Sequence, residues 1–317
     1  MSHAFDANVA IAAGAIVSGA FFGDKMSPLS DTCTIAASVV GIDLFEHIRN
    51  MMYTTVPAWI ITALLFWFLS GNTTTSDLSR VTALQGQLID SGLVHGYAVL
   101  PFLVLIILAV LRVNAIYTII CTIIAALIVT YLHSSPDIGQ LGGYFFQGYH
   151  PAENLDLGDV GGILSRGGVN SIFFTQTIVI LALSLGGLLT TLGILPALLL
   201  GIEDSLNTSG RAIAAAAMSA LGINVLIGEQ YLSLLLSGTA FRPVFERLNL
   251  HPKNLSRTLE DAGTVINPLV PWSVCGVFIS QALGVPVLDY LPYAFFCYLS
   301  FLLTILSVSY THLTLPT

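Results

Sequence analysis

The hydrophobic residues are gathered in long apolar windows separated by short polar breaks. A helix needs about 20 mostly apolar residues to cross a bilayer. Several windows without a polar interruption approach or exceed that length. Two of them are separated only by Arg112, which predicts that they form an antiparallel pair. The pattern predicts an all-α, polytopic bundle of transmembrane helices, with windows at residues 56–69, 93–111, 113–132, 171–200 and 290–308.

Three further windows are apolar but interrupted by Gly, Pro, Asp, Glu or Asn. They cover residues 9–40, 212–241 and 262–287. In lipid every backbone amide must be satisfied within the protein, so a broken helix survives only where it is buried or lines a wet cavity. Interrupted segments are also where transporters place their binding sites. We therefore expect broken or re-entrant helices here, and the functional site among them.

Composition supports a membrane protein and argues against several other classes. Of the 317 residues, 55% are hydrophobic and only 9% are charged, against about 25% charged in a soluble domain. The lipid bilayer is thus the expected surrounding. The net charge of −8 argues against nucleic acid as a partner, because that needs a basic face. The sequence contains no HExxH, GxSxG or Walker motif, so we expect neither an enzyme nor a cofactor. The four cysteines have no pairing or CxxC spacing and are expected to be small apolar core residues.

Two connections stand out between the windows. Residues 134–170 are polar and rich in glycine, and we expect them to form an exposed connection. Residues 242–257 form the most basic short loop, which the positive-inside rule places in the cytoplasm. The helix count does not agree with one orientation throughout, so the sequence leaves the orientation open. It also leaves a homodimer open.

The chain resembles itself weakly. Ala10-Ile-Ala-Ala leads to Gly23-Asp24, and Ala212-Ile-Ala-Ala leads to Gly228-Glu229; a competing alignment sets Ser27-Pro-Leu against Asn267-Pro-Leu. Such repetition predicts two matching halves. We expect residues 1–90 to be the C-terminal part of a first repeat and 91–308 the second, with roughly a hundred residues preceding Met1. Residues 309–317 break the helical pattern and are expected to be a non-native tail.

The interrupted windows carry four carboxylates: Asp24, Asp31, Glu229 and Asp261. A charged side chain at the bilayer centre costs about 2.5–3.5 kcal/mol on insertion scales, so it is kept there for a function. The alternative is a position at the membrane–water interface, where a carboxylate costs little. Lys25 is expected either to pair with a carboxylate or to extend outward.

Neutral oxygen donors surround these acids. Sodium, like calcium and magnesium, is a hard cation that prefers oxygen ligands, and prolines free additional backbone carbonyls. The set predicts a site for sodium or protons, although helix N-termini at the breaks are equally suited to a carboxylate substrate. The candidate ion-binding residues are Asp24, Ser27, Ser30, Asp31, Thr32, Asn224, Glu229, Asp261, Thr264, Asn267 and Ser273.

Long matches around the breaks resemble the NhaC family of sodium/proton antiporters. They are residues 23–32 (GDKMSPLSDT), 228–231 (GEQY) and 251–273 (HPKNLSRTLEDAGTVINPLVPWS). The resemblance implies a multi-pass protein of the cell inner (cytoplasmic) membrane that exchanges sodium for protons. It implies two inverted repeats with re-entrant hairpins, of which the first repeat is incomplete here. Some members of the family exchange malate and lactate together with sodium and protons, which is the alternative function.

The resemblance also suggests how the exchange would work. One carboxylate, Asp31 or Asp24, would bind either sodium or a proton, with Asp31 and Asn267 as the tentative sodium ligands. Because occupancy by one excludes the other, alternating access then gives coupled exchange. Cys33-Thr34 stands where Thr-Asn is more usual in the family, and the loss of that amide would weaken or retune the site.

The substitution Asp31→Asn tests this assignment. The amide keeps the size of the side chain but removes the charge that both cations need, so exchange should be abolished while membrane insertion is unchanged. Exchange is measured in vesicles and insertion by the amount of protein in the membrane. Exchange that survives in the variant would remove Asp31 from the site.

Overall fold

Helices make up all of the regular structure that can be described. The computed structural model describes residues 8–70, 79–90, 94–150, 161, 165, 167–195, 197 and 206–311, and each regular element among them is an α-, 3₁₀- or π-helix. Four helices in this part of the chain are long and apolar enough to cross a membrane, and two bent pairs raise the number to six. The four are α3 (Leu44–Ser70), α6 (Ala115–His133), α9 (Gly168–Thr191) and α11 (Ser209–Ile227). The prediction of an all-α, multi-pass membrane protein is confirmed.

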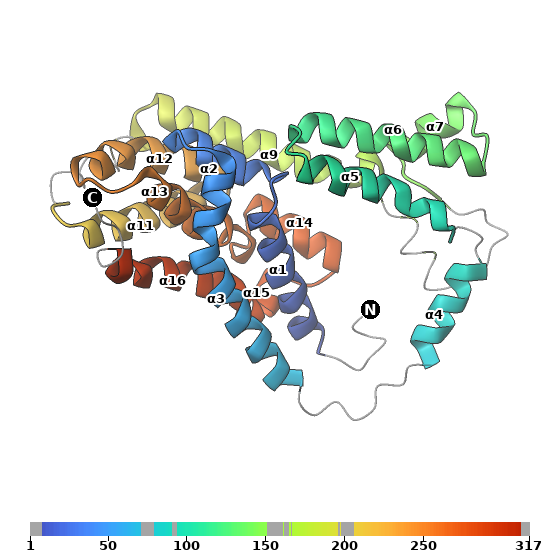
Figure 1. Ribbon diagram of the computed structural model, residues 1–317, viewed down its shortest axis with the longest axis horizontal. Helices are drawn as coiled ribbons and strands as arrows, with labels where there is room; N and C mark the ends of the chain where they lie inside the picture. Colours follow the sequence, from blue (N-terminus) through green and yellow to red (C-terminus); the bar gives the residue numbers. More distant parts are fainter. Residues whose placement is uncertain are drawn as a thin grey trace. The chain divides into compact units, whose positions relative to one another are not determined.

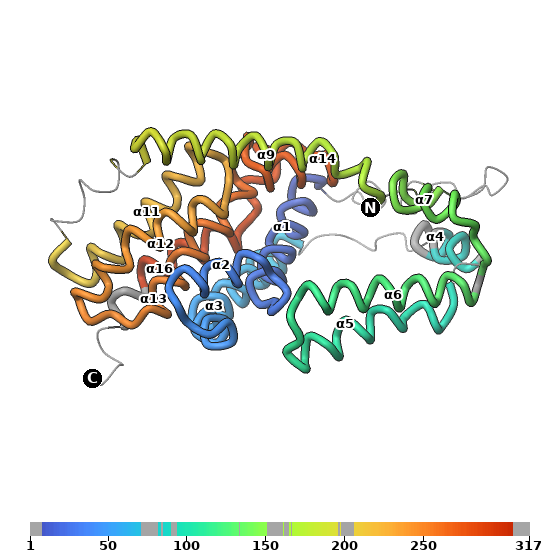
Figure 2. Tube along the Cα trace, turned by 90° about the horizontal axis from the view of Figure 1, so that it is seen from above, coloured from blue at the N-terminus to red at the C-terminus, as the bar shows by residue number. Residues whose placement is uncertain are grey.

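The chain divides into two compact units, essentially residues 74–177 and residues 7–73 with 178–317. The first unit contains the antiparallel pair that the sequence predicted (Figures 1 and 2). Helix α5 (Leu100–Val110) and helix α6 pack side by side, and the chain reverses between them at Arg112, whose φ is 59°. Large apolar side chains on α6, such as Ile116, are exposed, as expected of a surface that faces lipid.

The connection expected at residues 134–170 contains a helix that the sequence analysis did not identify. Helix α7 (Ile138–Phe146) lies within it. It forms because Asp137 and Gln140 make a reciprocal capping box at its first turn, which satisfies two backbone N–H groups that the helix start leaves open. The first unit also contains η2 (Gly96–Val99) and α4 (Ser79–Asp90), a helix too polar to be recognised from its hydrophobic pattern.

The second unit holds the interrupted segments, and two of them break where the sequence predicted. Helix α1 (Val9–Lys25) ends, five residues follow, and α2 (Asp31–Val40) begins with Ser30 as its N-cap. Helix α11 ends at Gly228, whose φ of 76° suits glycine, and Glu229 caps α12 (Gln230–Arg247). Each break therefore places capping side chains and free backbone groups inside the unit.

The third interruption is the most irregular. Helix α13 (Pro252–Leu259) runs into a π-turn, η4 (Glu260–Thr264), then into a short 3₁₀-turn, η5 (Asn267–Leu269), and on to α14 (Val274–Leu283). The two halves of this pair are bent by 46°. π-Turns inside helices occur frequently at functional sites, because the extra residue changes which side chains point inward.

Helices α2 and α14 share one local design. Each is capped by a serine (Ser30 or Ser273), has ten residues, and ends at a left-handed glycine (Gly41 or Gly284). The alignment of residues 27–29 with 267–269 stays a prediction, because the caps and glycines are related by a different offset from the two Pro-Leu pairs. The division at residue 90 into two repeats stays a prediction.

Two apolar clusters form the core of the second unit. One gathers around α11 and α12, where small side chains of α11, including Ala212, Ala216 and Ala220, are fully buried and allow close helix packing. The other joins α1 to α15 (Val287–Tyr290), η6 (Leu291–Tyr293) and α16 (Phe295–Thr311). Helix α16 thus continues through the first three residues of the expected tail; residues 312–317 lie outside the described residues.

The contact of α1 with η6 gives a test of this packing. A Cβ added at Gly14 would lie 2.4 Å from Cβ of Tyr293 and 2.7 Å from its carbonyl oxygen, whereas one at Gly19, on the same helix, meets nothing within 4 Å. Gly14→Ala should therefore lower the unfolding free energy by about 1–3 kcal/mol through overpacking. Gly19→Ala is the matched control, because both gain the same helix propensity. Thermal unfolding in detergent measures the difference, and equal stability of the two variants would contradict the packing described.

Candidate functional site

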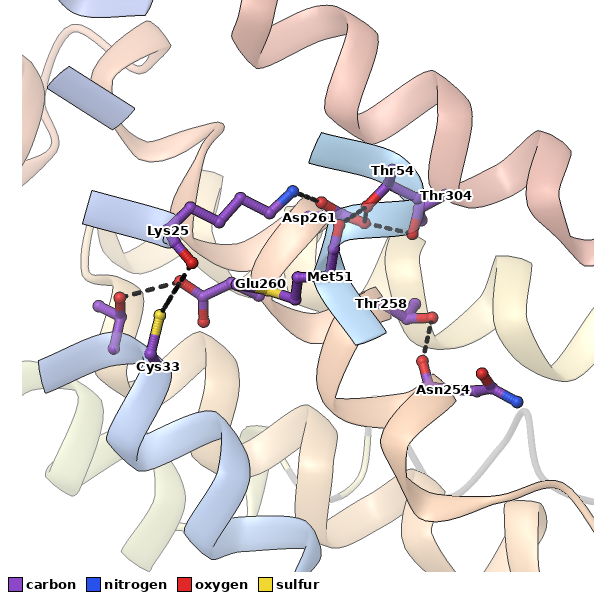
Figure 3. A network of polar contacts seen from close by, with 10 residues as sticks. Lys25, Cys33, Met51, Thr54, Asn254, Thr258, Glu260, Asp261 and Thr304 are labelled. Carbon is purple, nitrogen blue, oxygen red and sulfur yellow. Dashed lines mark hydrogen bonds and ion pairs between the residues drawn. The ribbon is translucent and has the colours of Figure 1, made fainter. Parts of the chain in front are cut away.

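A buried polar network joins the interrupted segments inside the second unit (Figure 3). Its centre is the π-turn, where two neighbouring carboxylates, Glu260 and Asp261, are both fully buried. Residues next to each other on a regular helix point in directions about 100° apart, so the two acids meet different partners. Figure 3 shows Lys25 next to Asp261 and Cys33 next to Glu260.

Asp261 is fully hydrogen-bonded and ion-paired in one half of the network. Its Oδ1 forms a short ion pair with Nζ of Lys25, and its Oδ2 accepts hydrogen bonds from Thr54 Oγ1 at 2.9 Å and Thr304 Oγ1 at 2.6 Å. Lys25 is fully buried as well. Buried charges are tolerated when they are paired and hydrogen-bonded, so this carboxylate holds α1, α3, α16 and η4 to one another. Of the two alternatives that the sequence left open for Lys25, the structure shows pairing with a carboxylate.

Glu260 occupies the other half of the network and shares one hydroxyl group with Asp24. Thr32 Oγ1 lies 2.9 Å from Glu260 Oε1 and 3.4 Å from Asp24 Oδ2. It also lies 3.0 Å from Ser30 Oγ. A hydroxyl has one hydrogen to donate, so Thr32 serves only one of the two carboxylates fully at any moment.

Two further oxygen atoms belong to the π-turn itself. Glu260 Oε2 and Thr264 Oγ1 are buried and make no hydrogen bond of good geometry in the described part of the chain, although the Thr264 hydroxyl lies close enough to Glu260 to interact with it. A buried polar atom left unpaired costs about 1–3 kcal/mol. A proton or a cation shared among these oxygens would remove that cost, so the arrangement can bind a small positive species.

The predicted amide ligands have a different set of contacts. Asn267 Nδ2 donates to Asn224 Oδ1 at 2.6 Å, and Asn267 Oδ1 accepts from the N–H of Cys275 at 2.9 Å. Asn224 Nδ2 donates to the carbonyl of Gly263, and Ser273 Oγ donates to the carbonyl of Asn267 at 2.5 Å. These side chains tie the broken segments together, and their role as ion ligands stays a prediction.

The remaining candidates lie toward the surface or at caps. Asp31 is exposed and accepts a short hydrogen bond from the hydroxyl of Tyr231. Glu229 is buried and accepts from the N–H of Leu232 at 2.9 Å, and Ser27 accepts from the N–H of Leu29 at 3.1 Å. These three side chains therefore cap turns or face outward in the structure as it stands.

Charge repulsion nevertheless links Asp31 to the buried acids. It acts between Asp31 and both Asp24 and Glu229, and again between Asp24 and Glu260. The carboxylates thus form a series that runs from the exposed Asp31 through Asp24 to the buried Glu260. Carboxylates that repel one another favour the uptake of protons or cations.

Sequence reasoning missed Glu260, Thr54 and Thr304. Glu260 stood next to Asp261 in the same motif, but helical periodicity places only one of two neighbouring residues on a buried face. The π-turn and packing from several sides bury both. Threonines within apolar helices usually satisfy their hydroxyl on a carbonyl of the preceding turn, so Thr54 and Thr304 gave no signal.

Comparisons with known proteins place this arrangement in a family. The model of the Na⁺/H⁺ antiporter family matches residues 19–310. The chain is 42% identical over 298 residues to the Na⁺/H⁺ antiporter NhaC of Alkalihalophilus pseudofirmus, an alignment that covers 94% of the chain and 64% of that protein. It is 40% identical over 297 residues to NhaC of Bacillus subtilis, covering 93% and 65%.

A more distant relative carries a different name. The malate-2H⁺/Na⁺-lactate antiporter of Bacillus subtilis is 32% identical over 303 residues, covering 95% of the chain and 64% of that protein. The chain therefore spans slightly less than two thirds of the length of these relatives. No solved structure matches the chain.

The ion pair between Lys25 and Asp261 gives a test of the network. Lys25→Met leaves Asp261 buried without its partner and should lower the unfolding free energy by about 3–5 kcal/mol. The double variant Lys25→Met/Asp261→Leu removes both charges and should regain much of that loss. Chemical unfolding in detergent measures all three proteins. A double variant no more stable than the single one would contradict a direct pair.

Proposed function

The chain belongs to the Na⁺/H⁺ antiporter family, and on that basis we propose that the whole protein exchanges sodium ions for protons across the cytoplasmic membrane. The relatives of highest identity named above are antiporters rather than enzymes. The observation that carries the proposal is the Thr32 hydroxyl shared between Asp24 and Glu260, beside a carboxylate oxygen with no partner in the described part of the chain.

The two acids can be balanced by either cation. Lys25 is paired with Asp261, and Asp24 and Glu260 are the acids that we propose for exchangeable charge. A proton on Glu260 removes its negative charge and gives it a hydrogen to donate. A sodium ion instead uses the same oxygens as ligands, joined by Thr32 and Ser30, because hard cations prefer oxygen.

Exclusion between the two cations is the basis of coupling. A protonated carboxyl is a poor ligand for sodium, and a bound sodium ion disfavours protonation. If the site faces each side of the membrane in turn, the protein returns with one cation after delivering the other. The broken helices that form the site are the elements expected to change its access.

This assignment moves the coupling group from the position that the sequence suggested. We propose Glu260, with Asp24 and Thr32, as the coupling centre, and Asp31 at the outer end of the carboxylate series. The support is burial: Glu260 and Thr32 are fully buried and Asp31 is exposed. A buried carboxylate has the stronger need for a proton or cation.

Sodium-driven proton movement in everted vesicles tests the proposal, with a pH-sensitive dye and the chain completed to the length of its relatives. Glu260→Gln should abolish the response to sodium, because the amide is not protonated near neutral pH and has no negative charge for which protons and sodium ions could compete. Glu246→Gln is the matched control, since Glu246 is exposed and pairs only with Arg242 in the described part of the chain, and it should respond like the unmodified protein.

Two outcomes would contradict the proposal. An undiminished sodium response in Glu260→Gln would remove this carboxylate from the coupling centre. The second outcome is a response that requires malate and lactate on opposite sides and does not occur with sodium alone. It would favour organic-anion exchange, the activity in the name of the more distant relative, over simple cation exchange.

A further inference from the structure

Three buried side chains of different chemistry converge beside the π-turn. One ligand atom from each of Cys33, His47 and Glu260 lies within 4.8 Å of the other two. The three come from α2, α3 and η4, and each residue is fully buried. Figure 3 shows the Cys33 sulfur and the Glu260 carboxylate facing the same space. The three residues are far apart in the chain, so they form no motif that the sequence alone would reveal.

The hydrogen bonds of His47 leave one ring nitrogen with an available lone pair. Nδ1 lies 2.9 Å from Ser256 Oγ, and Ser256 Oγ donates its own hydrogen to the carbonyl of Lys253 at 3.0 Å. Ser256 must then accept from Nδ1–H, which leaves Nε2 without a hydrogen. Nε2 is buried and has no partner in the described part of the chain. A histidine oriented in this way by a second hydrogen bond is typical of metal ligands.

Glu260 and Cys33 complete a mixed donor set. Glu260 is fixed through Oε1 by Thr32, while Oε2 has no partner among the described residues. The Cys33 sulfur lies 3.4 Å from the carbonyl of Lys25 and 4.0 Å from Glu260 Oε1. Lys25, the nearby cation, is paired with Asp261, and Asp24 adds negative charge. Two carboxylates, Asp24 and Glu260, therefore lie beside this space, opposed by the charge of Lys25, which also reaches His47.

We propose that Cys33, His47 and Glu260 form a binding site for a thiophilic divalent cation such as zinc. Sulfur, imidazole nitrogen and carboxylate oxygen are the three ligand types of zinc, and its usual bond lengths place tetrahedral ligand atoms about 3.5 Å apart. A bound metal would therefore draw the ligand atoms together by about 1 Å. On binding, the Cys33 S–H proton leaves to bulk water and the thiolate takes its place on the metal.

Occupancy of this site has a consequence for exchange, and this part rests on the proposed function. The metal would take Glu260 from the Thr32 hydroxyl and cross-link α2, α3 and η4. A cross-link among the broken segments opposes any change of access. Zinc is therefore expected to inhibit sodium–proton exchange, whereas the binding itself is independent of whether exchange occurs.

Titration of the purified chain in detergent with Co²⁺, which substitutes for zinc and gives a thiolate charge-transfer absorption band, tests the site directly. We expect one Co²⁺ per chain, displaced by Zn²⁺. Cys33→Ser should eliminate the band and, like His47→Gln, weaken binding by about 100-fold or more, and Ser256→Ala by about 10–100-fold through loss of the orienting hydrogen bond. Cys121→Ser, at an exposed cysteine of α6, should bind as the unmodified protein does.

The controls separate this inference from the proposed exchange. Each variant is first checked by thermal unfolding, and Ser256→Ala, which alters no ligand, provides a second variant should Cys33→Ser fail to fold. An undiminished charge-transfer band in Cys33→Ser, or a band lost only in Cys121→Ser, would overturn the site. Zinc that binds through Cys33 but leaves exchange unaffected would overturn the inhibition alone. Absence of sodium exchange in the unmodified protein would count against the proposed function and leave the cobalt titration as it is.

Discussion

The ion pair between Lys25 and Asp261 is the interaction on which the rest of the site depends. Removing two charges from water costs free energy. The cost is offset here because the charges pair with each other and two threonine hydroxyls donate hydrogen bonds to the second carboxylate oxygen. The pair joins a helix end, two long helices and the π-turn. The pair also occupies Lys25, so the neighbouring acids Asp24 and Glu260 make no ion pair with it in the part of the chain that the structure describes and are the groups proposed to bind exchangeable cations.

The other half of the polar network, around Glu260, has fewer hydrogen-bond donors than its carboxylate oxygens could accept. Thr32 offers one hydrogen to two carboxylates, and Glu260 keeps an oxygen without a partner in the described part of the chain. A fully satisfied network would rigidify the segments and have no need for a ligand. The proposed exchange and the proposed zinc site both rest on this shortage, because a proton, a sodium ion or a zinc ion would each supply the missing positive charge.

The sequence predicted the helical membrane class and the places where helices break, because lipid enforces long apolar runs and polar interruptions are conspicuous within them. It also singled out four acids in the interrupted windows, of which Glu229 and Asp261 are buried, Asp24 is half-buried and Asp31 is exposed. It could not predict that Glu260 and Asp261 are both buried, since that requires a π-turn, nor that Asp31 faces outward. Helices α4 and α7 escaped notice because capping and polar faces, rather than an apolar stripe, define them.

The adjacency of Glu260 and Asp261 has a mechanical meaning. Consecutive Cα atoms are about 3.8 Å apart and joined by a planar peptide, so the carboxylate proposed to bind the exchanged cation and the carboxylate that anchors the surrounding helices share one rigid link. A shift of the backbone at Glu260 would therefore move Asp261 directly, without any intervening chain of contacts.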